Sequence, residues 1–160
     1  MGNRALIIGK GSNVGIYLHW NGGRDSVEAF LRWAELSKLP SIENRGEIAL
    51  AAVIANFFGT DGNSISLETV NRGSLQPSAP YDNGIYSVEN HQIVGRIMPP
   101  RIEQRGHDLT DMLILIDGRQ PERDKLGTQI LLAEERPPAE HPAGERVFLR
   151  APHGEEKYLV

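Results

Sequence analysis

Cysteine is absent from the 160-residue sequence, which excludes disulfide bonds and cysteine-ligated zinc. This absence fits a reducing cytosol. Basic residues are in the minority, because 17 Lys and Arg stand against 21 Asp and Glu and give a formal net charge of −4. A chain without a basic field is a poor partner for polymeric nucleic acid. Any phosphate site must therefore be local.

Long apolar runs are also missing. The longest, IALAAVIANFF at 48–58, is far too short to cross a bilayer. The N-terminal MGNRALIIGKG has neither the pattern of a signal peptide nor the Ser or Thr at position 6 that myristoylation requires. We therefore expect no membrane partner and a cytoplasmic location.

Motifs for catalysis and for metal or cofactor binding are lacking as well. There is no G-x-S-x-G, and none of the five histidines has a partner at the spacing of H-E-x-x-H. GKGSNVG at 9–15 lacks the GK[ST] ending of a P-loop and precedes a strand. We expect no metal, no cofactor and no enzymatic activity.

The residues that are present predict a β-hairpin at the start of the chain. ALIIG at 5–9 and GIYLHW at 15–20 are strand-like runs joined by a short glycine-containing segment. In the second strand, alternation places Tyr17 and His19 on one face and Trp20 on the other. The turn NGG at 21–23 follows directly.

Three helices are predicted after this hairpin. DSVE opens the first, with Asp25 as N-cap and Glu28 completing a capping box. Its buried stripe is Val27, Phe30, Leu31 and Ala34. The second helix, about 45–58, is apolar nearly all round, which predicts a central buried helix. The third, 108–120, is capped by Asp108.

Strands at 64–70, 84–90 and 92–98 complete the pattern, the last two joined through Asn90 and His91. The order ββααβββα predicts an α+β domain over 1–127, with a mainly antiparallel sheet and about three helices. Residues 128–160 form a proline-rich, charged C-terminal extension, in which TQILLA and RVFLRA predict short strands.

The turn NGGRDS is the best candidate for a phosphate site. It offers glycine amides and the bidentate fork of Arg24 beside a helix N-terminus. Because Asp25 occupies the cap, Arg24 would be the phosphate contact. The structural alternative is a surface ion pair of Arg24 with Asp25 or Glu28.

Aromatic residues near loop ends extend this candidate site. Trp20, beside His19, is either a core plug or a flat surface for a base. ANFFG ends the second helix, so Phe57 or Phe58 must point away from its core stripe. YDNG adds an aromatic residue and an amide, and the candidate ligand-binding residues are thus His19, Trp20, Arg24, Phe57, Phe58, Tyr81 and Asn83. The same residue types suit a protein interface.

Four segments resemble a known family when taken in order: GIYLHWNGGRDSVEAFL, VIANFFG, YDNGIYSVENHQIVGR and LTDMLILIDGRQPERDKLG. Over about residues 3–127 the chain resembles the first described family of anti-Thoeris sponge proteins, small phage and prophage proteins. The resemblance implies a non-enzymatic protein that sequesters the cyclised ADP-ribose signal of bacterial TIR enzymes. Related members also capture cyclic oligonucleotides of the CBASS system, at separate sites in a homo-oligomer.

The positions that carry over from the resemblance are Arg24, Phe57, Phe58 and Asn83; the extension beyond 127 departs from the compact family form. We therefore expect a homo-oligomer whose partners are a cyclic ADP-ribose isomer, cyclic oligonucleotides or both. Two alternatives remain open. One is a phosphodiesterase-like enzyme, for which the only local acid–base pairs are His19 with Glu28 and His107 with Asp111. The other is a protein-binding inhibitor of a host defence factor.

Overall fold

A computed structural model describes residues 3–59, 64–70, 82–98 and 106–133, and the backbone of two strands at 146–150 and 156–159. Its sheet has seven strands in the order β3-β2-β1-β4-β5-β6-β7. The strands are β1 Ala5–Gly9, β2 Val14–Leu18, β3 Ile65–Thr69, β4 Ile85–Glu89, β5 Gln92–Met98, β6 Arg146–Arg150 and β7 Glu156–Leu159. Pairs β1–β4 and β5–β6 are parallel and the other four are antiparallel, which confirms the predicted α+β class with a mainly antiparallel sheet.

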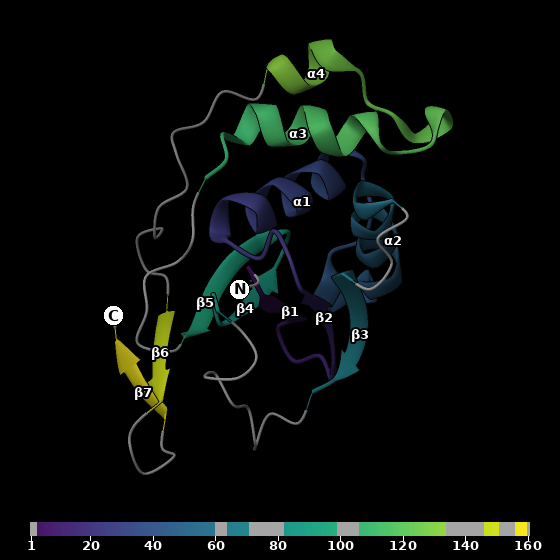
Figure 1. Ribbon diagram of the computed structural model, residues 1–160. Coiled ribbons are helices and arrows are strands. Elements are labelled where there is room, and N and C mark those ends of the chain that lie inside the picture. The colour runs from purple at the N-terminus through teal and green to yellow at the C-terminus, as the bar shows by residue number, and fades with distance from the viewer. Residues whose placement is uncertain are drawn as a thin grey trace.

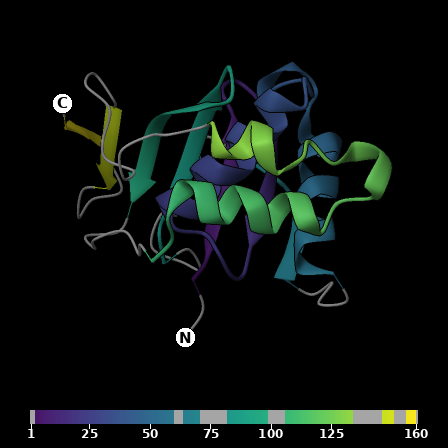
Figure 2. The ribbon, with the colours of Figure 1, turned by 90° about the horizontal axis from the view of Figure 1, so that it is seen from above.

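Helices form further layers on one face of the sheet. They are α1 Arg24–Leu36, α2 Glu47–Phe58, α3 Leu109–Gly118 and the short α4 Thr128–Leu132, with 3-10 turns at Ile42–Asn44 and Glu122–Asp124. Helix α1 lies against the sheet, α2 stands beside it near β2 and β3, and α3 crosses above α1 with α4 on its outer side (Figure 1). The view from above shows α3 and α4 covering α1 (Figure 2).

The predicted stripe of α1 forms the centre of the core. Its four residues are at most 2% exposed and face the sheet beside Ile7 and Ile16 of β1 and β2. On its outer side Trp33 is also buried, and its indole N–H donates to Asp117 of α3 at 2.9 Å. Because apolar or hydrogen-bonded groups cover α1 on both sides, α1 is the central helix of the domain.

The prediction that residues 45–58 form the central helix was wrong. Helix α2 buries Leu50, Val53, Ile54 and Phe57, but Ile48 is 76% exposed and Ala52 and Ala55 also face outward. The apolar composition gave a wrong prediction because exposing the small alanine side chain to water costs little free energy. A helix rich in alanine can therefore lie at the edge of a domain as well as at its centre.

The predicted N-cap of the first helix was also wrong. Gly23 is the N-cap and makes no side-chain cap bond, so the helix begins at Arg24. The Asp25 carboxylate instead accepts the N–H groups of Gly106 and His107, at 2.6 and 2.7 Å, and that of Ser26 at 2.8 Å. It ties the start of α1 to the segment that leads into α3, a role that depends on residues more than 80 positions away.

The other turns follow the sequence more closely. Asn90 and His91 have φ of 51° and 60° and join β4 to β5, as predicted, in the left-handed conformation that suits a two-residue hairpin. Asp108 caps α3 by accepting the N–H of Asp111 at 3.2 Å, also as predicted.

The extension contains one helix where a strand was predicted. RVFLR forms β6, but residues 128–132 form α4, whose Leu131 is 1% exposed in the main core. A short apolar run fits a helix or a strand equally well, and packing against α3 decides here. Within the described ranges, no helix has both the length and the apolar character that a membrane span requires.

Candidate functional site

Polar and aromatic side chains gather where β1 and β4 begin and β2 ends. The segments are tied together by backbone hydrogen bonds, from Asn3 N to His19 O at 3.0 Å and from Asn83 N to Arg4 O at 2.9 Å. We name this region the polar end; it comprises Asn3, Arg4, Tyr17, His19, Trp20, Asn21, Asp82 and Asn83. It lies at the start of α1, because β2 passes into that helix through the turn at 21–23.

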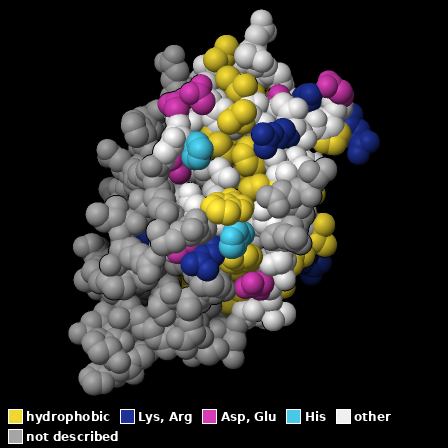
Figure 3. All heavy atoms as spheres, viewed as in Figure 1, with side chains coloured by type: hydrophobic (Ala, Val, Ile, Leu, Met, Phe, Trp, Pro, Cys, Tyr) yellow, Lys and Arg dark blue, Asp and Glu magenta, His cyan; other side chains and the backbone are white. Residues whose placement is uncertain are grey.

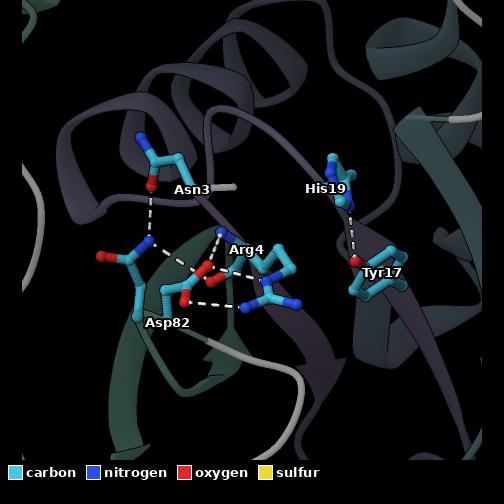
Figure 4. Close-up of polar contacts among 6 residues, drawn as sticks. Asn3, Arg4, Tyr17, His19 and Asp82 are labelled. Carbon is cyan, nitrogen blue, oxygen red and sulfur yellow. Dashed lines mark hydrogen bonds and ion pairs between the residues drawn. The ribbon is translucent and has the colours of Figure 1, made fainter. Parts of the chain in front are cut away.

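An arginine is held rigidly at the polar end. Asp82, only 8% exposed, accepts Arg4 Nε at 2.8 Å and Nη2 at 3.0 Å, and it also accepts the Arg4 backbone N–H at 3.1 Å. The hydrogen bond to Asp82 raises the pKa of Arg4 further above its ordinary value. Figure 4 shows this fork, with Arg4 lying between Asp82 and Tyr17. The guanidinium is therefore fixed in direction while its side chain stays 32% exposed.

Three aromatic rings form a row along the end of β2. The Tyr17 hydroxyl hydrogen-bonds His19 Nδ1 at 3.0 Å, with the ring centroids 6.3 Å apart. His19 in turn meets Trp20 edge to face, at 5.0 Å and 83°. Trp20 is 40% exposed, which excludes a core plug and leaves its indole available to a ligand or a partner. Figure 3 shows histidine and hydrophobic side chains side by side on this face of the molecule.

The pKa of the Tyr17 hydroxyl lies above its ordinary value. Burial is the largest cause, the Arg4 charge acts against it, and Glu68 and Asp82 add to it. Tyr17 therefore stays protonated at neutral pH, as a hydrogen-bonding partner of His19.

Asn83 has a structural position. It is 0% exposed, its amide donates to Asn3 Oδ1 and to the Arg4 carbonyl, and its own carbonyl accepts Arg96 Nε at 2.7 Å. It thus joins the start of β1 to the segment before β4, and because it is fully buried it supports the backbone of Arg4 and does not face solvent.

Arg24 lies inside the protein, which contradicts its predicted surface location, although its predicted pairing with Glu28 is present. It is 0% exposed, and its Nη1 lies 3.8 Å from Glu28 Oε1, one turn along α1. Its Cζ is 5.7 Å from the centroid of the buried Tyr86 ring, and Arg96 stands at the same distance from that ring. The surface prediction failed because the helix begins at Arg24 and turns its side chain toward the sheet.

The remaining predicted residues lie elsewhere or outside the description. Phe57 lies in the core, with its ring centroid 5.3 Å from that of Phe30. The Cζ atom of Arg119 lies 4.9 Å from the Phe57 ring centroid. Phe58 is half-buried against Phe57. Tyr81 falls outside the described residues. The contacts thus bring His19 and Trp20 together, place Asn83 beside Asn3 and Arg4 at the same end of the sheet, and place Phe57 and Phe58 in a separate cluster.

Sequence reasoning missed Arg4, Tyr17 and Asp82. The Tyr17–His19 pair could have been found, because strand residues two apart share a face. The Arg4–Asp82 pair could not, since its members are 78 positions apart and Arg4 stands in no motif, although Asp82 belongs to YDNG.

Acid–base and metal chemistry find little support among the described side chains. His19 bonds Tyr17 and Glu28 pairs with Arg24, while His107 Nε2 lies 3.4 Å from Asn21 Nδ2. Neither predicted acid–base pair is among these contacts. Over the described ranges, no group of three His, Asp or Glu side chains is placed to hold a metal ion.

Comparison of the chain with protein-family models, with curated proteins and with solved structures finds no match in any of the three.

Proposed function

We propose that this chain is a phage-encoded, non-enzymatic protein that binds and sequesters a cyclic nucleotide immune signal in the cytoplasm of the infected bacterium. The ligands are a cyclic ADP-ribose isomer, cyclic oligonucleotides or both. The observation that carries the proposal is the aromatic row Tyr17–His19–Trp20 beside an arginine fixed by Asp82.

The polar end offers both kinds of contact that a nucleotide requires. A base stacks on an exposed aromatic face, and Trp20 presents one. A phosphate takes charge-assisted hydrogen bonds, and a preorientated guanidinium gives them at a low entropic cost. Since the net charge is −4, such local contacts suit a small phosphorylated ligand better than a nucleic acid polymer.

Sequestration requires slow dissociation of the ligand and no chemical reaction of it. An enclosed pocket slows release, and two subunits close over a charged ligand more readily than one half-exposed surface does. The proposal therefore includes a homo-oligomer. It also agrees with the resemblance of four sequence segments to anti-Thoeris sponge proteins.

The experiment is a mass balance. Cyclic ADP-ribose, and separately a cyclic dinucleotide, are incubated with excess protein, filtered, and recovered after heat denaturation of the retained protein. We expect at least one of them to leave the filtrate and to return intact. A cleaved product would overturn sequestration in favour of a phosphodiesterase. Full recovery of every nucleotide in the first filtrate would overturn nucleotide binding, and stable capture of one host protein would then favour the inhibitor.

Trp20→Ala tests the observation that carries the proposal. Stacking of a base is worth about 1–3 kcal/mol, so we expect capture to weaken by about five- to a hundredfold. The matched control is Leu67→Ala, which removes a similarly exposed apolar side chain from β3. It should leave capture unchanged.

A further inference from the structure

We infer that Arg4 and His19 together form a phosphate-binding subsite on the sheet face opposite α1. This inference rests on the proposed function and assigns one part of the ligand to named atoms. Asp82 and Tyr17 act as positioning residues, one for each contact group.

Register and hydrogen bonding connect the two contact groups. Tyr17 lies between them in the contact network: Leu6 pairs with Tyr17, so Arg4 and Tyr17 are diagonal neighbours on one face of the sheet, and the Tyr17 hydroxyl bonds His19. Diagonal neighbours lie about 7–8 Å apart, within reach of long side chains. Alternation sends Arg4 to the same face as Leu6 and Ile8, which form a second apolar cluster away from α1.

The Arg4 fork keeps one nitrogen outside its ion pair. Asp82 takes Nε and Nη2, and Nη1 lies on the Tyr17 side of the guanidinium (Figure 4). In this arrangement a buried carboxylate binds one edge of the guanidinium and holds it in place. The other edge then remains available to donate hydrogen bonds to an anion.

His19 is orientated in the same manner. Its Nδ1 is held by the Tyr17 hydroxyl, which leaves Nε2 outside that bond. When Tyr17 donates to Nδ1, the proton of the neutral ring is on Nε2, which then donates to a phosphate oxygen. Trp20 lies edge to face with His19 and is exposed, so it can stack on the base of the same ligand.

The nearest carboxylate is Asp82, whose charge is paired with Arg4, and a second carboxylate, Glu68, lies on the neighbouring strand. Glu68 of β3 pairs with Gly15, whereas His19 bonds the carbonyl of Ser64. Four residues of strand separate the two positions, or about 13 Å at about 3.3 Å per residue. At that distance the screened repulsion is small beside a direct arginine contact.

The test measures side-chain nitrogen NMR signals of the full chain during titration with inorganic phosphate, cyclic ADP-ribose and adenosine. We expect phosphate and cyclic ADP-ribose to shift the Arg4 Nε–H and His19 Nε2 signals, and adenosine to leave Arg4 unmoved. Arg4→Gln should weaken cyclic ADP-ribose binding about ten- to a hundredfold, the range for hydrogen bonds to a charged group. Arg123→Gln, which alters an arginine that is 85% exposed on the far 3-10 turn, is the matched control and should bind normally.

Two further variants keep the outcome interpretable. Arg4→Gln leaves Asp82 buried without its partner, so the double variant Arg4→Gln/Asp82→Asn removes both charges; weak binding in a protein that melts normally supports the subsite. Tyr17→Phe should change the His19 tautomer signature in the nitrogen spectrum and weaken binding about two- to tenfold. A purely structural Tyr17 would leave that signature unchanged, which would overturn its positioning role.

The results separate this inference from the proposed function. Wild-type affinity in the folded double variant, or an Arg4 signal unmoved at saturating cyclic ADP-ribose, overturns the subsite while sequestration stands. Shifts caused by phosphate in a protein that captures no cyclic nucleotide support the subsite and overturn sequestration.

Discussion

Burial decides whether an arginine can contact a ligand, and Arg4 and Arg24 differ in this respect. Arg24 stands in a conspicuous glycine turn, yet it is 0% exposed and packs over Tyr86. Arg4 stands in no motif, yet it is partly exposed and is orientated by a carboxylate 78 positions away. Local sequence therefore identified the segment of the candidate site but not the arginine that can reach a ligand.

Arg24→Ala should destabilise the protein. The change removes a fully buried side chain from the Tyr86 ring and leaves Glu28 without this partner. We expect the free energy of unfolding to fall by about 2–3 kcal/mol, as for other losses of buried charged contacts. Urea unfolding followed by tryptophan fluorescence measures it.

The matched control is Arg123→Ala, at an arginine 85% exposed, where a loss within about 0.5 kcal/mol is expected. If both variants unfold at the same urea concentration, the burial of Arg24 contributes nothing and this assignment is wrong.

For helices and strands, the periodicity of the sequence predicted those features that depend only on residues within the same element. The stripe of α1 and the β4–β5 turn followed from spacing and turn chemistry alone. The exposure of α2 and the helical state of α4 did not, because each depends on which neighbour covers the element. Asp25 failed as a cap for the same reason, since backbone N–H groups before α3 recruit its carboxylate.

Asp117 connects three helices, and Asp117→Ala should loosen them together. Its carboxylate accepts the Trp33 indole N–H at 2.9 Å and the N–H groups of Leu126 and Gly127 at 2.7 and 3.1 Å. Removing it leaves the buried Trp33 N–H unsatisfied, at a cost of about 1–3 kcal/mol, and takes the acceptor from the part-buried N–H groups of Leu126 and Gly127. We expect unfolding stability to fall by about 2–4 kcal/mol and hydrogen-exchange protection to be lost first at Gly127 and Leu131.

Asp111→Ala, on the exposed first turn of the same helix, is the comparison. Its carboxylate favours the helix N-terminus by about 0.3–1 kcal/mol, so a small loss is expected. Equal losses at positions 111 and 117 would refute the connecting role.

For the protein as a whole, we expect the boundary of the stable unit to lie beyond α4 and not at residue 127. Leu131 belongs to the main core, so truncation after Ala133 should leave a single cooperative melt. Truncation after Gly127 removes α4 and should lower the free energy of unfolding by about 2 kcal/mol or more, the value of one buried leucine. Calorimetry of the two truncated chains measures the difference.

The paired variants Leu131→Ala and Leu132→Ala test whether the buried leucine of α4 accounts for this loss of stability. Leu131 is 1% exposed and Leu132 is 54% exposed, so about 2–5 kcal/mol is expected for the first and less than about 0.5 kcal/mol for the second. Loss of cooperative melting in the chain truncated after Ala133 would mean that β6 and β7 are needed for folding.

The position of β1 between β2 and β4 has a consequence for synthesis on the ribosome. The hairpin partner β2 follows within a few residues, but β4 and the Asp82 that fixes Arg4 come 78 positions later. At about 5–20 residues per second, the gap lasts roughly 4–16 s. During that time one edge of an apolar strand has no partner, so the nascent chain is most exposed to aggregation before residue 82 emerges.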